Sequence, residues 1–228
     1  TITATLYDAN DNAISGKTVT LASSRGGSDT ISAASGASNA SGVVTFTVSS
    51  LVAGTSTYTA TNSTDTGAIT QTANVTYTAG AATHLTVSGF ADPTVAGVSH
   101  NVTVTALDAN NNIVTNYAGT VTLTSNDGQA VLPAASTLTN GTKSFAVTLK
   151  TAGTKSITAS DGTLSASQTG IVVNPAAYDV TQSVVTASAA TVASGSSLTI
   201  TLTTKDAYGN TNPSGLPATG SIAFTSSL

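Results

Sequence analysis

Three short stretches of the chain place carboxylate and amide oxygens at alternate positions, as the first half of a calcium-binding loop does. Their oxygen-bearing residues are, in chain order, Asp8, Asn10 and Asn12; Asp108, Asn110 and Asn112; and Asp206 and Asn210. A Ca²⁺ ion takes about six to eight oxygen ligands, and EF-hand loops supply them from alternate residues. A bound Ca²⁺ is therefore one interpretation of the first two stretches.

A hairpin turn is the other interpretation. Ala13 and Ile113 stand where an EF-hand loop has its glycine, and the chain contains no Glu that would close the coordination shell. Asp and Asn tolerate left-handed backbone conformations and hydrogen-bond to their own backbone, and Gly209 provides the same freedom in the third stretch. We expect a turn that every repeat needs at the same place, with a cation site as the alternative.

The rest of the chain offers no cluster for catalysis. His84 and His100 are the only histidines, and they have no Cys or His partner at a metal-ligand spacing. No nucleophile motif frames a serine. We predict a protein that is not an enzyme, with no catalytic residues and no cofactor besides the alternative Ca²⁺. Tyr117 and Tyr208, the only loop aromatics able to stack on a sugar, are the candidates for ligand binding.

The elements that position these residues are predicted by composition to be strands. Only 7% of the 228 residues are charged, Cys, Met, Trp and Glu are absent, and about one residue in five is Thr. Strong helix formers are therefore scarce, whereas Thr and Val suit a pleated, half-buried surface. Composition predicts an all-β protein.

Charge and hydropathy exclude two classes of partner. The net charge is −4, and six Lys and Arg residues make no stripe that would bind phosphates, so nucleic acid is not an expected partner. No apolar run reaches the roughly 18 residues that span a membrane, so direct membrane insertion is not expected either. The absence of Cys excludes disulfides and fits a bacterial exported protein.

An internal repeat of about 99 residues organises the chain. Phe46 and Phe145 lie 99 residues apart (145 − 46), as do Gly54 and Gly153 (153 − 54), within similar sequences. Matching segments keep their order along the chain. We expect module one at residues 1–79, lacking its first strand; a complete module two at 80–175; and the N-terminal half of module three at 176–228, so that the chain is a window from a longer array.

Within module two, short segments alternate apolar residues with Thr or Ser and end at Gly, Asn, Asp or Pro. The predicted strands are His84–Gly89, Asn101–Asp108, Thr120–Ser125, Lys143–Lys150, Thr154–Asp161 and Ser167–Asn174. Six or seven such strands in about 99 residues are typical of an immunoglobulin-like sandwich. Only about four residues, with Ala and Pro among them, join successive modules, which favours a semi-rigid, rod-like array.

The order of these motifs resembles the bacterial Ig-like domains of the invasin and intimin type. The stretches "TATLYDANDNAISGKTVTLASS", "SNASGVVTFTVSS" and "AGTSTYTAT" carry the resemblance across module one, and module two looks like a close cousin. The resemblance implies tandem sandwiches of a large surface adhesin, located outside the cell on a bacterial surface. Such modules serve as stalks or spacers that extend a distal binding region.

Two alternatives stay open beside the stalk. The incomplete modules expose strand edges, which other copies of the chain would fill in a self-assembling extracellular filament. The loops of one module would instead bind a host-surface protein or a glycan. The expected partners are accordingly neighbouring modules of the same chain, other copies in a filament, or such a host ligand.

Overall fold

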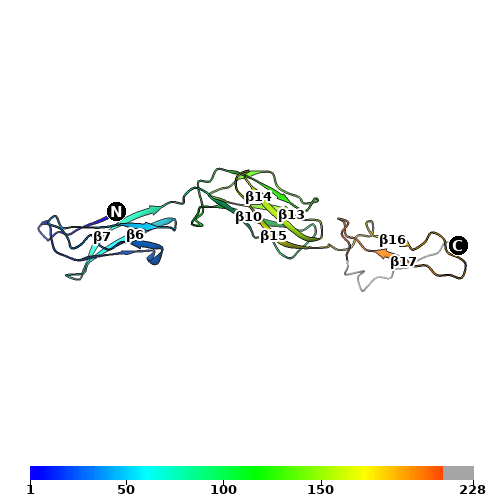
Figure 1. The fold of residues 1–228 in the computed structure, drawn as a ribbon, viewed down its shortest axis with the longest axis horizontal. Helices are drawn as coiled ribbons and strands as arrows, with labels where there is room; N and C mark the ends of the chain where they lie inside the picture. The colour runs from blue at the N-terminus through cyan, green and yellow to red at the C-terminus, as the bar shows by residue number, and fades with distance from the viewer. Residues whose placement is uncertain (213–228) are drawn as a thin grey trace. The chain divides into compact units, whose positions relative to one another are not determined.

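The computed structural model describes residues 1–212 and is built almost wholly of strands (Figure 1). In this described part, the one helical segment is a short 3-10 turn, η1 (Gly26–Ser28), and no helix is long and apolar enough to cross a membrane. The chain divides into two compact units. Unit 1 comprises Thr1–Ala82 with Leu107–Val114, and unit 2 comprises Thr83–Ala106 with the chain from Thr115 onward.

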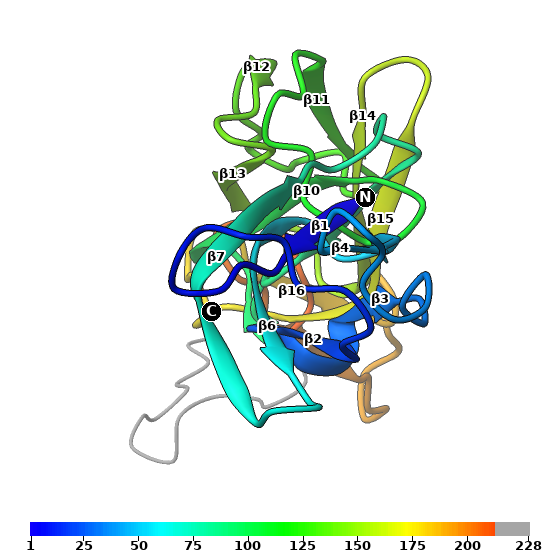
Figure 2. The ribbon, with the colours of Figure 1, turned by 90° about the vertical axis from the view of Figure 1, so that its left-hand side faces the viewer.

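Unit 1 is a sandwich of antiparallel sheets, and Figure 2 shows β6 beside β7 in it. Its strands are β1 (Ile2–Thr5), β2 (Val19–Ser23), β3 (Asp29–Ile31), β4 (Val43–Phe46), β5 (Val48–Ser50), β6 (Gly54–Asn62) and β7 (Gly67–Tyr77). β1 pairs with β4, β3 pairs with β5, and β2, β6 and β7 form the third sheet. Alternate residues face inward, so Val44, Phe46 and Tyr58 meet in one core.

Unit 2 contains a more complete sandwich. Its strands are β8 (His84–Ser88), β9 (Thr94–Val95), β10 (Ser99–Leu107), β11 (Thr120–Ser125), β12 (Ser136–Thr137), β13 (Thr142–Thr148), β14 (Gly153–Ser160) and β15 (Ser165–Asn174). One sheet has the order β13-β10-β8 and the other the order β12-β11-β14-β15-β9. β9 runs parallel to β15, whereas the pairs β10–β13, β11–β12, β11–β14 and β14–β15 are antiparallel.

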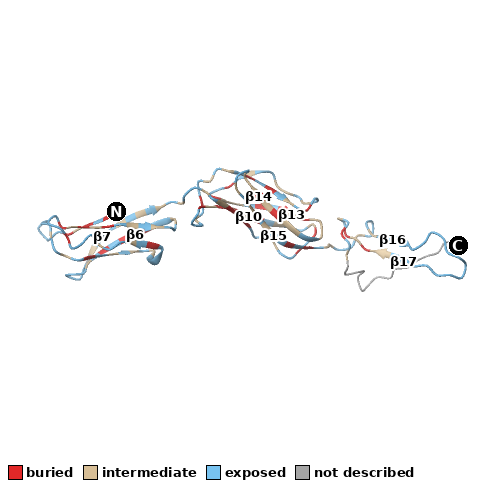
Figure 3. Cartoon of the chain, viewed as in Figure 1, coloured by how far each residue is buried: buried red, intermediate tan, exposed pale blue. Residues whose placement is uncertain are grey.

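The period-two pattern of the sequence is what places this core. Val102, Val104 and Ala106 on β10 are fully buried, as are Ile157 and Ala159 on β14. The Thr residues between them face outward because successive side chains of a strand point to opposite sides. Figure 3 colours buried residues red along the chain. The predicted all-β, immunoglobulin-like fold is therefore confirmed, and the predicted strands of module two match β8, β10, β11, β13, β14 and β15 to within two residues at each end.

The last described strands are β16 (Val184–Ala187) and β17 (Ile200–Thr203), an antiparallel pair whose residues are exposed or half-buried. The end of the predicted half-module, residues 213–228, lies outside the described part of the chain. The predicted boundaries 1–79, 80–175 and 176–228 stay a prediction. The names module one, module two and module three refer to them below.

Candidate functional site

Each of the three Asp-Ala stretches folds as a tight turn at the end of a strand. Isolated antiparallel bridges close the turns: Tyr7 with Ala13, Leu107 with Ile113, and Lys205 with Thr211. The fourth residue of each turn is left-handed, with φ of 61° at Asp11, 62° at Asn111 and 83° at Gly209. Asn, Asp and Gly are the residues that adopt this conformation most readily, which explains why the stretch is written with them.

The aspartate carboxylate is the centre of each turn. Oδ1 of Asp108 accepts hydrogen bonds from the backbone N–H groups of Asn110 and Asn112, both at 2.9 Å, and Oδ2 accepts one from Nδ2 of Asn112 at 3.0 Å. Asp8 makes the same three bonds with Asn10 and Asn12, again at 2.9, 2.9 and 3.0 Å. The predicted site residues therefore do come together, around amide donors that belong to the turn itself.

These bonds favour the ionised carboxylate. The side-chain amide of Asn112, followed by the backbone N–H groups of Gly80 and Asn112, lowers the pKa of Asp108 below its ordinary value. The side chain of Asn12 lowers the pKa of Asp8 in the same way. Burial acts to raise the pKa of Asp206, but the bonds from Asn210 and Ala176 outweigh it and lower the pKa.

The turns differ in what surrounds them. Asp8, Asn10 and Asn12 are exposed, whereas Asp108 is 4% exposed. The second turn belongs to unit 1, where Asn112 contacts the connection between β5 and β6. Nδ2 of Asn112 donates to the carbonyl of Leu51 at 2.8 Å, and Oδ1 accepts from the N–H of Ala53 at 2.8 Å.

The third turn repeats these contacts inside unit 2. Nδ2 of Asn210 donates to the carbonyl of Lys150 at 2.7 Å, and Oδ1 accepts from the N–H of Ala152 at 2.8 Å. Asp206 is fully buried, and its Oδ2 also accepts from the N–H of Ala176 at 2.9 Å. The side-chain amides of Asn112 and Asn210 thus bond to backbone groups of the unit to which each turn belongs.

No group of three or more His, Cys, Asp or Glu side chains that would hold a metal lies within residues 1–212. The Ca²⁺ alternative at Asp8, Asn10 and Asn12, and at Asp108, Asn110 and Asn112, stays a prediction. In this structure the carboxylate oxygens of both turns face N–H donors.

The two candidate ligand-binding tyrosines each contact their own chain. The hydroxyl of Tyr117 donates to Oδ2 of Asp161, and burial, followed by this hydrogen bond, raises the pKa of Tyr117 to about 12. The ring of Tyr208 lies 5.6 Å from Nζ of Lys150 and against Gly97, where a Cβ would stand 2.1 Å from the hydroxyl. Their role in ligand binding stays a prediction.

The sequence analysis missed one pair of polar residues, Arg25 and Asp127. Both follow an aligned strand, "VTLAS" at Val19 and "VTLTS" at Val121, by two residues. Arg25 donates to the carbonyls of Val52 and Ala53 at 3.0 and 3.1 Å.

Asp127 holds the equivalent turn of module two by the opposite chemistry. Its Oδ2 accepts from the N–H groups of Lys150 and Thr151 at 2.6 and 2.9 Å. The alignment of the two strands was the available signal, because it places a cation and an anion at one position of the repeat. The same two turns are those that Asn112 and Asn210 contact.

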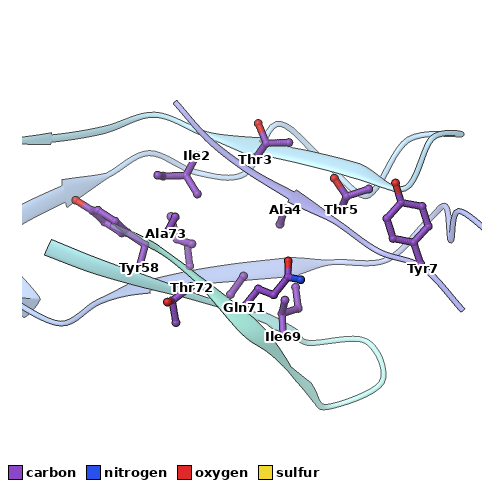
Figure 4. A pocket seen from close by; sticks show the side chains of 12 residues that line it. Ile2, Thr3, Ala4, Thr5, Tyr7, Tyr58, Ile69, Gln71, Thr72 and Ala73 are labelled. Carbon is purple, nitrogen blue, oxygen red and sulfur yellow. The ribbon is translucent and has the colours of Figure 1, made fainter. Parts of the chain in front are cut away.

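A groove of about 400 Å³ opens into the core of unit 1 between β1 and β7 (Figure 4). Among the residues that line it are Ile2, Ala4, Leu21, Tyr58, Ala60, Ile69 and Ala73. In the described chain β1 pairs with β4 alone, whereas its counterpart β10 pairs with β13 on one side and β8 on the other. The groove therefore lies where β8 packs in module two.

Exposure supports this correspondence. Ile2, Ala4 and Leu6 are 9%, 6% and 8% exposed, and their counterparts on β10 are 0% exposed. On β8, Leu85 and Val87 are the inward-facing residues, at 3% and 9% exposed. An extended strand with two alternating apolar side chains, like β8, therefore matches the groove in shape.

Comparisons with known proteins agree with this fold. The family model of the bacterial Ig-like domain (group 1) matches residues 1–78. Among solved structures, the chain is similar to InvD of Yersinia pseudotuberculosis at 22% identity and a TM-score of 0.50, covering 92% of this chain and 65% of that one. It is also similar to FdeC, an Escherichia coli adhesin, at 23% identity and a TM-score of 0.49, covering 89% of this chain and 67% of that one.

Invasin, a bacterial integrin-binding protein, is similar at 18% identity and a TM-score of 0.40, covering 92% of this chain and 43% of that one. A search of the curated proteins finds no match. The chain spans about 65% of the InvD structure, and the likeness to InvD concerns the fold.

Proposed function

We propose that the chain is a stretch of stalk or spacer modules in a bacterial cell-surface adhesin or extracellular fibre, and the match of residues 1–78 to the family model of the bacterial Ig-like domain (group 1) supports this proposal. In this role the modules extend a distal binding region away from the cell. Each sandwich resists extension through its strand ladders, and its low charge and many hydroxyl groups present a soluble, chemically inert surface.

The observation that carries this proposal is the recurrence of one module design at a spacing of about 99 residues. β1 and β10 bury alternate residues in the same register, β6 and β14 do likewise, and an Asp-centred turn follows β1 and β10 at the same place. A spacer needs only such repetition, whereas a catalytic or binding domain needs side chains that set one module apart.

Small-angle scattering tests the proposal. The full chain is compared with a chain that carries one additional copy of residues 80–175 between modules two and three. For a stalk, we expect the maximum dimension to increase by roughly the length of one sandwich. A maximum dimension that grows only as the cube root of the mass, as for a single globule, would overturn the stalk.

A second function, assembly by strand complementation, is favoured by the groove between β1 and β7. Among the described residues β1 pairs with β4 alone, so its other edge can offer backbone hydrogen bonds to an added strand, and the groove can accept alternate apolar side chains. The strand that fits is one like β8, supplied by another copy of the chain in a filament.

A synthetic peptide of residues 82–89 tests this second function on the full chain. We expect the peptide to bind and to slow hydrogen exchange of those β1 amides that point away from β4. A control peptide with Leu85→Ser and Val87→Ser should not bind, because it cannot fill the groove. Equal exchange of β1 with either peptide at millimolar concentration would exclude complementation at this edge.

A further inference from the structure

The side chain of Asn112 pairs with the chain around Val52 as one peptide group pairs with another. Its Nδ2 donates to the carbonyl of Leu51 and its Oδ1 accepts from the N–H of Ala53, both at 2.8 Å. These two backbone groups belong to residues two apart and point the same way, as in the ladder of an antiparallel sheet. Asn112 therefore bonds to the backbone of the turn alone, and the contact does not depend on which side chains the turn carries.

Asp108 fixes the orientation of that amide. An ionised carboxylate only accepts hydrogen bonds, so the amide of Asn112 must turn its Nδ2 toward Asp108 and its Oδ1 away. One proton of Nδ2 is used by Asp108, and the other is directed at Leu51. Oδ2 of Asp108 also accepts from the N–H of Gly80 at 2.9 Å. Three backbone groups are thus held by one Asp-Asn pair.

The third turn holds three backbone groups in the same way. Asn210 bonds to the carbonyl of Lys150 and the N–H of Ala152, and Asp206 bonds to the N–H of Ala176. Lys150 and Leu51 are 99 residues apart (150 − 51), as are Ala152 and Ala53 (152 − 53). Two occurrences with different side chains at the contacted turn, Leu-Val-Ala and Lys-Thr-Ala, show that the arrangement is built into the repeat.

The first turn is built alike, but among the described residues the side chains of Asp8 and Asn12 form hydrogen bonds only within the turn. Asp8 accepts from Asn10 and Asn12 with the same distances as its counterparts, so the amide of Asn12 has the same orientation. Within residues 1–212, the side chain of Asn12 bonds to Asp8 alone. Its Oδ1, one Nδ2 proton and Oδ2 of Asp8 therefore present an acceptor, a donor and an acceptor to solvent.

We propose that each Asp-centred turn is a clasp, a binding site for the backbone of the turn between two strands of an adjacent Ig-like module. Among the described residues, the clasps of Asp108 and Asp206 hold such a turn (closed clasps), whereas the clasp of Asp8 holds none (open clasp). Its occupant is the turn of another Ig-like module that matches Leu51–Ala53. The proposal goes beyond the stalk, since a clasp joins modules equally well in a stalk or in a filament.

Hydrogen exchange of the full chain tests the closed clasps. Asn112→Ala removes both bonds to the Leu51–Ala53 turn, and we expect the amide of Ala53 to exchange roughly tenfold faster or more. Asn210→Ala should do the same to Ala152 and leave Ala53 unchanged. Asn12→Ala is the matched control, because it makes the same change inside its own turn and should alter neither amide.

Unchanged exchange at Ala53 in Asn112→Ala, or the same increase in Asn12→Ala, would overturn the clasp. Protection of the Val104 amide, in the core of unit 2, shows that each variant is folded. Proton exchange in these three variants does not depend on whether the chain forms a rod, so failure of the clasp and failure of the stalk are separate results.

The open clasp is tested by extending the chain. Thr1 aligns with Asn101 in the repeat (101 − 1 = 108 − 8), so residues 1–100 placed before Thr1 of the full chain reproduce the spacing between Ala53 and Asp108. We expect the amide of Ala53 in the added segment to become protected, and Asn12→Ala in the original segment to remove that protection. An added Ala53 that exchanges equally fast with and without Asn12→Ala would exclude the binding site.

Discussion

Module one and module two hold the same turn with opposite charges. In module one, the guanidinium of Arg25 donates to the carbonyls of Val52 and Ala53. In module two, the carboxylate of Asp127 accepts from the N–H groups of Lys150 and Thr151. Equivalent carbonyl and N–H groups of the two turns bond alike to Asn112 and Asn210. Arg25 and Asp127 bond to other peptide groups, which are not equivalent in the two turns. The comparison teaches that the repeat keeps the turn, whereas the charged side chain that holds the turn differs between modules.

The two charged residues also differ in how much else they hold. Arg25 forms an ion pair of 2.6 Å with Asp29, whose side chain is fully buried, and bonds to the hydroxyls of Ser50 and Ser56. Asp127 has no cationic partner among the described residues and is satisfied by backbone N–H groups and the Thr151 hydroxyl, at 2.6 Å. Module one therefore depends on a charge pair, and module two depends on hydrogen bonds to a single anion.

The largest expected effect comes from Arg25→Ala. It leaves the buried carboxylate of Asp29 without its cation and removes the guanidinium donor from the carbonyls of Val52 and Ala53. Breaking one side of a buried pair is strongly destabilising, so we expect the melting temperature of unit 1 to fall by roughly 10–20 °C. Calorimetry, with hydrogen exchange to assign the transitions, measures it. A fall in unit 2 of the same size would show that the effect is not local.

Asp127→Ala is the matched change in module two. It removes the acceptor from the N–H groups of Lys150, Thr151 and Gln129, which are then left without partners in a turn that unit 2 buries in part. We expect the melting temperature of unit 2 to fall by roughly 5–15 °C, with unit 1 unchanged. Asp127→Arg should be no better, because a donor would face donors. Rescue by Arg would contradict the proposed match between charge and peptide orientation.

Acid separates the two designs by a smaller effect. Burial acts to raise the pKa of Asp127, but the bonds from Thr151, Gln129 and Lys150 outweigh it and lower the pKa. A carboxylate with a lowered folded-state pKa stabilises fully above its unfolded pKa of about 3.9, and this contribution is lost as the pH falls toward the folded value. The difference in melting temperature between the wild type and Asp127→Asn should therefore be largest above about pH 5 and shrink below about pH 4. A constant difference down to pH 2.5 would show that ionisation of Asp127 does not matter.

The sequence alone predicted the strands and the Asp-centred turns, because both have local signals. Period-two alternation marks β10 and β14, and Asp, Asn and Gly mark residues that adopt left-handed conformations. It did not predict what Asn112 touches. That contact joins a side chain to backbone groups about 60 residues earlier. Because every residue type has the same backbone groups, the sequence gives no sign of which of them is contacted.

Arg25 and Asp127 were missed for a related reason. A repeat is recognised by similar residues at equivalent positions, and these two residues have opposite charges. The strand alignment places them at one position, but only the structure shows that both hold the turn before the next strand. Tyr117 and Tyr208 were proposed as ligand-binding residues because the sequence does not show which residues surround a side chain. Composition identifies an aromatic residue in a loop, but only the fold shows that Asp161 and Lys150 lie beside them.

The smallest expected effect concerns a second pair of equivalent turns, those that follow β6 in module one and β14 in module two. In module one, Lys17 and Asp65 form an ion pair of 2.9 Å with side chains that are 27% and 53% exposed. In module two, Asp161 accepts instead from the hydroxyl of Tyr117 and from the N–H of Leu164 at 2.6 Å.

Water and salt screen an exposed ion pair such as that of Lys17 and Asp65, and Asn62, which donates to Asp65 at 2.9 Å, is unaffected by removal of the lysine. We expect Lys17→Ala to change the melting temperature of unit 1 by less than about 3 °C, and less still at 1 M salt. Tyr117→Phe, which removes a half-buried donor that salt does not screen, should lower that of unit 2 by more. If the lysine variant proved the more damaging of the two, exposure would not be what sets the strength of these turns.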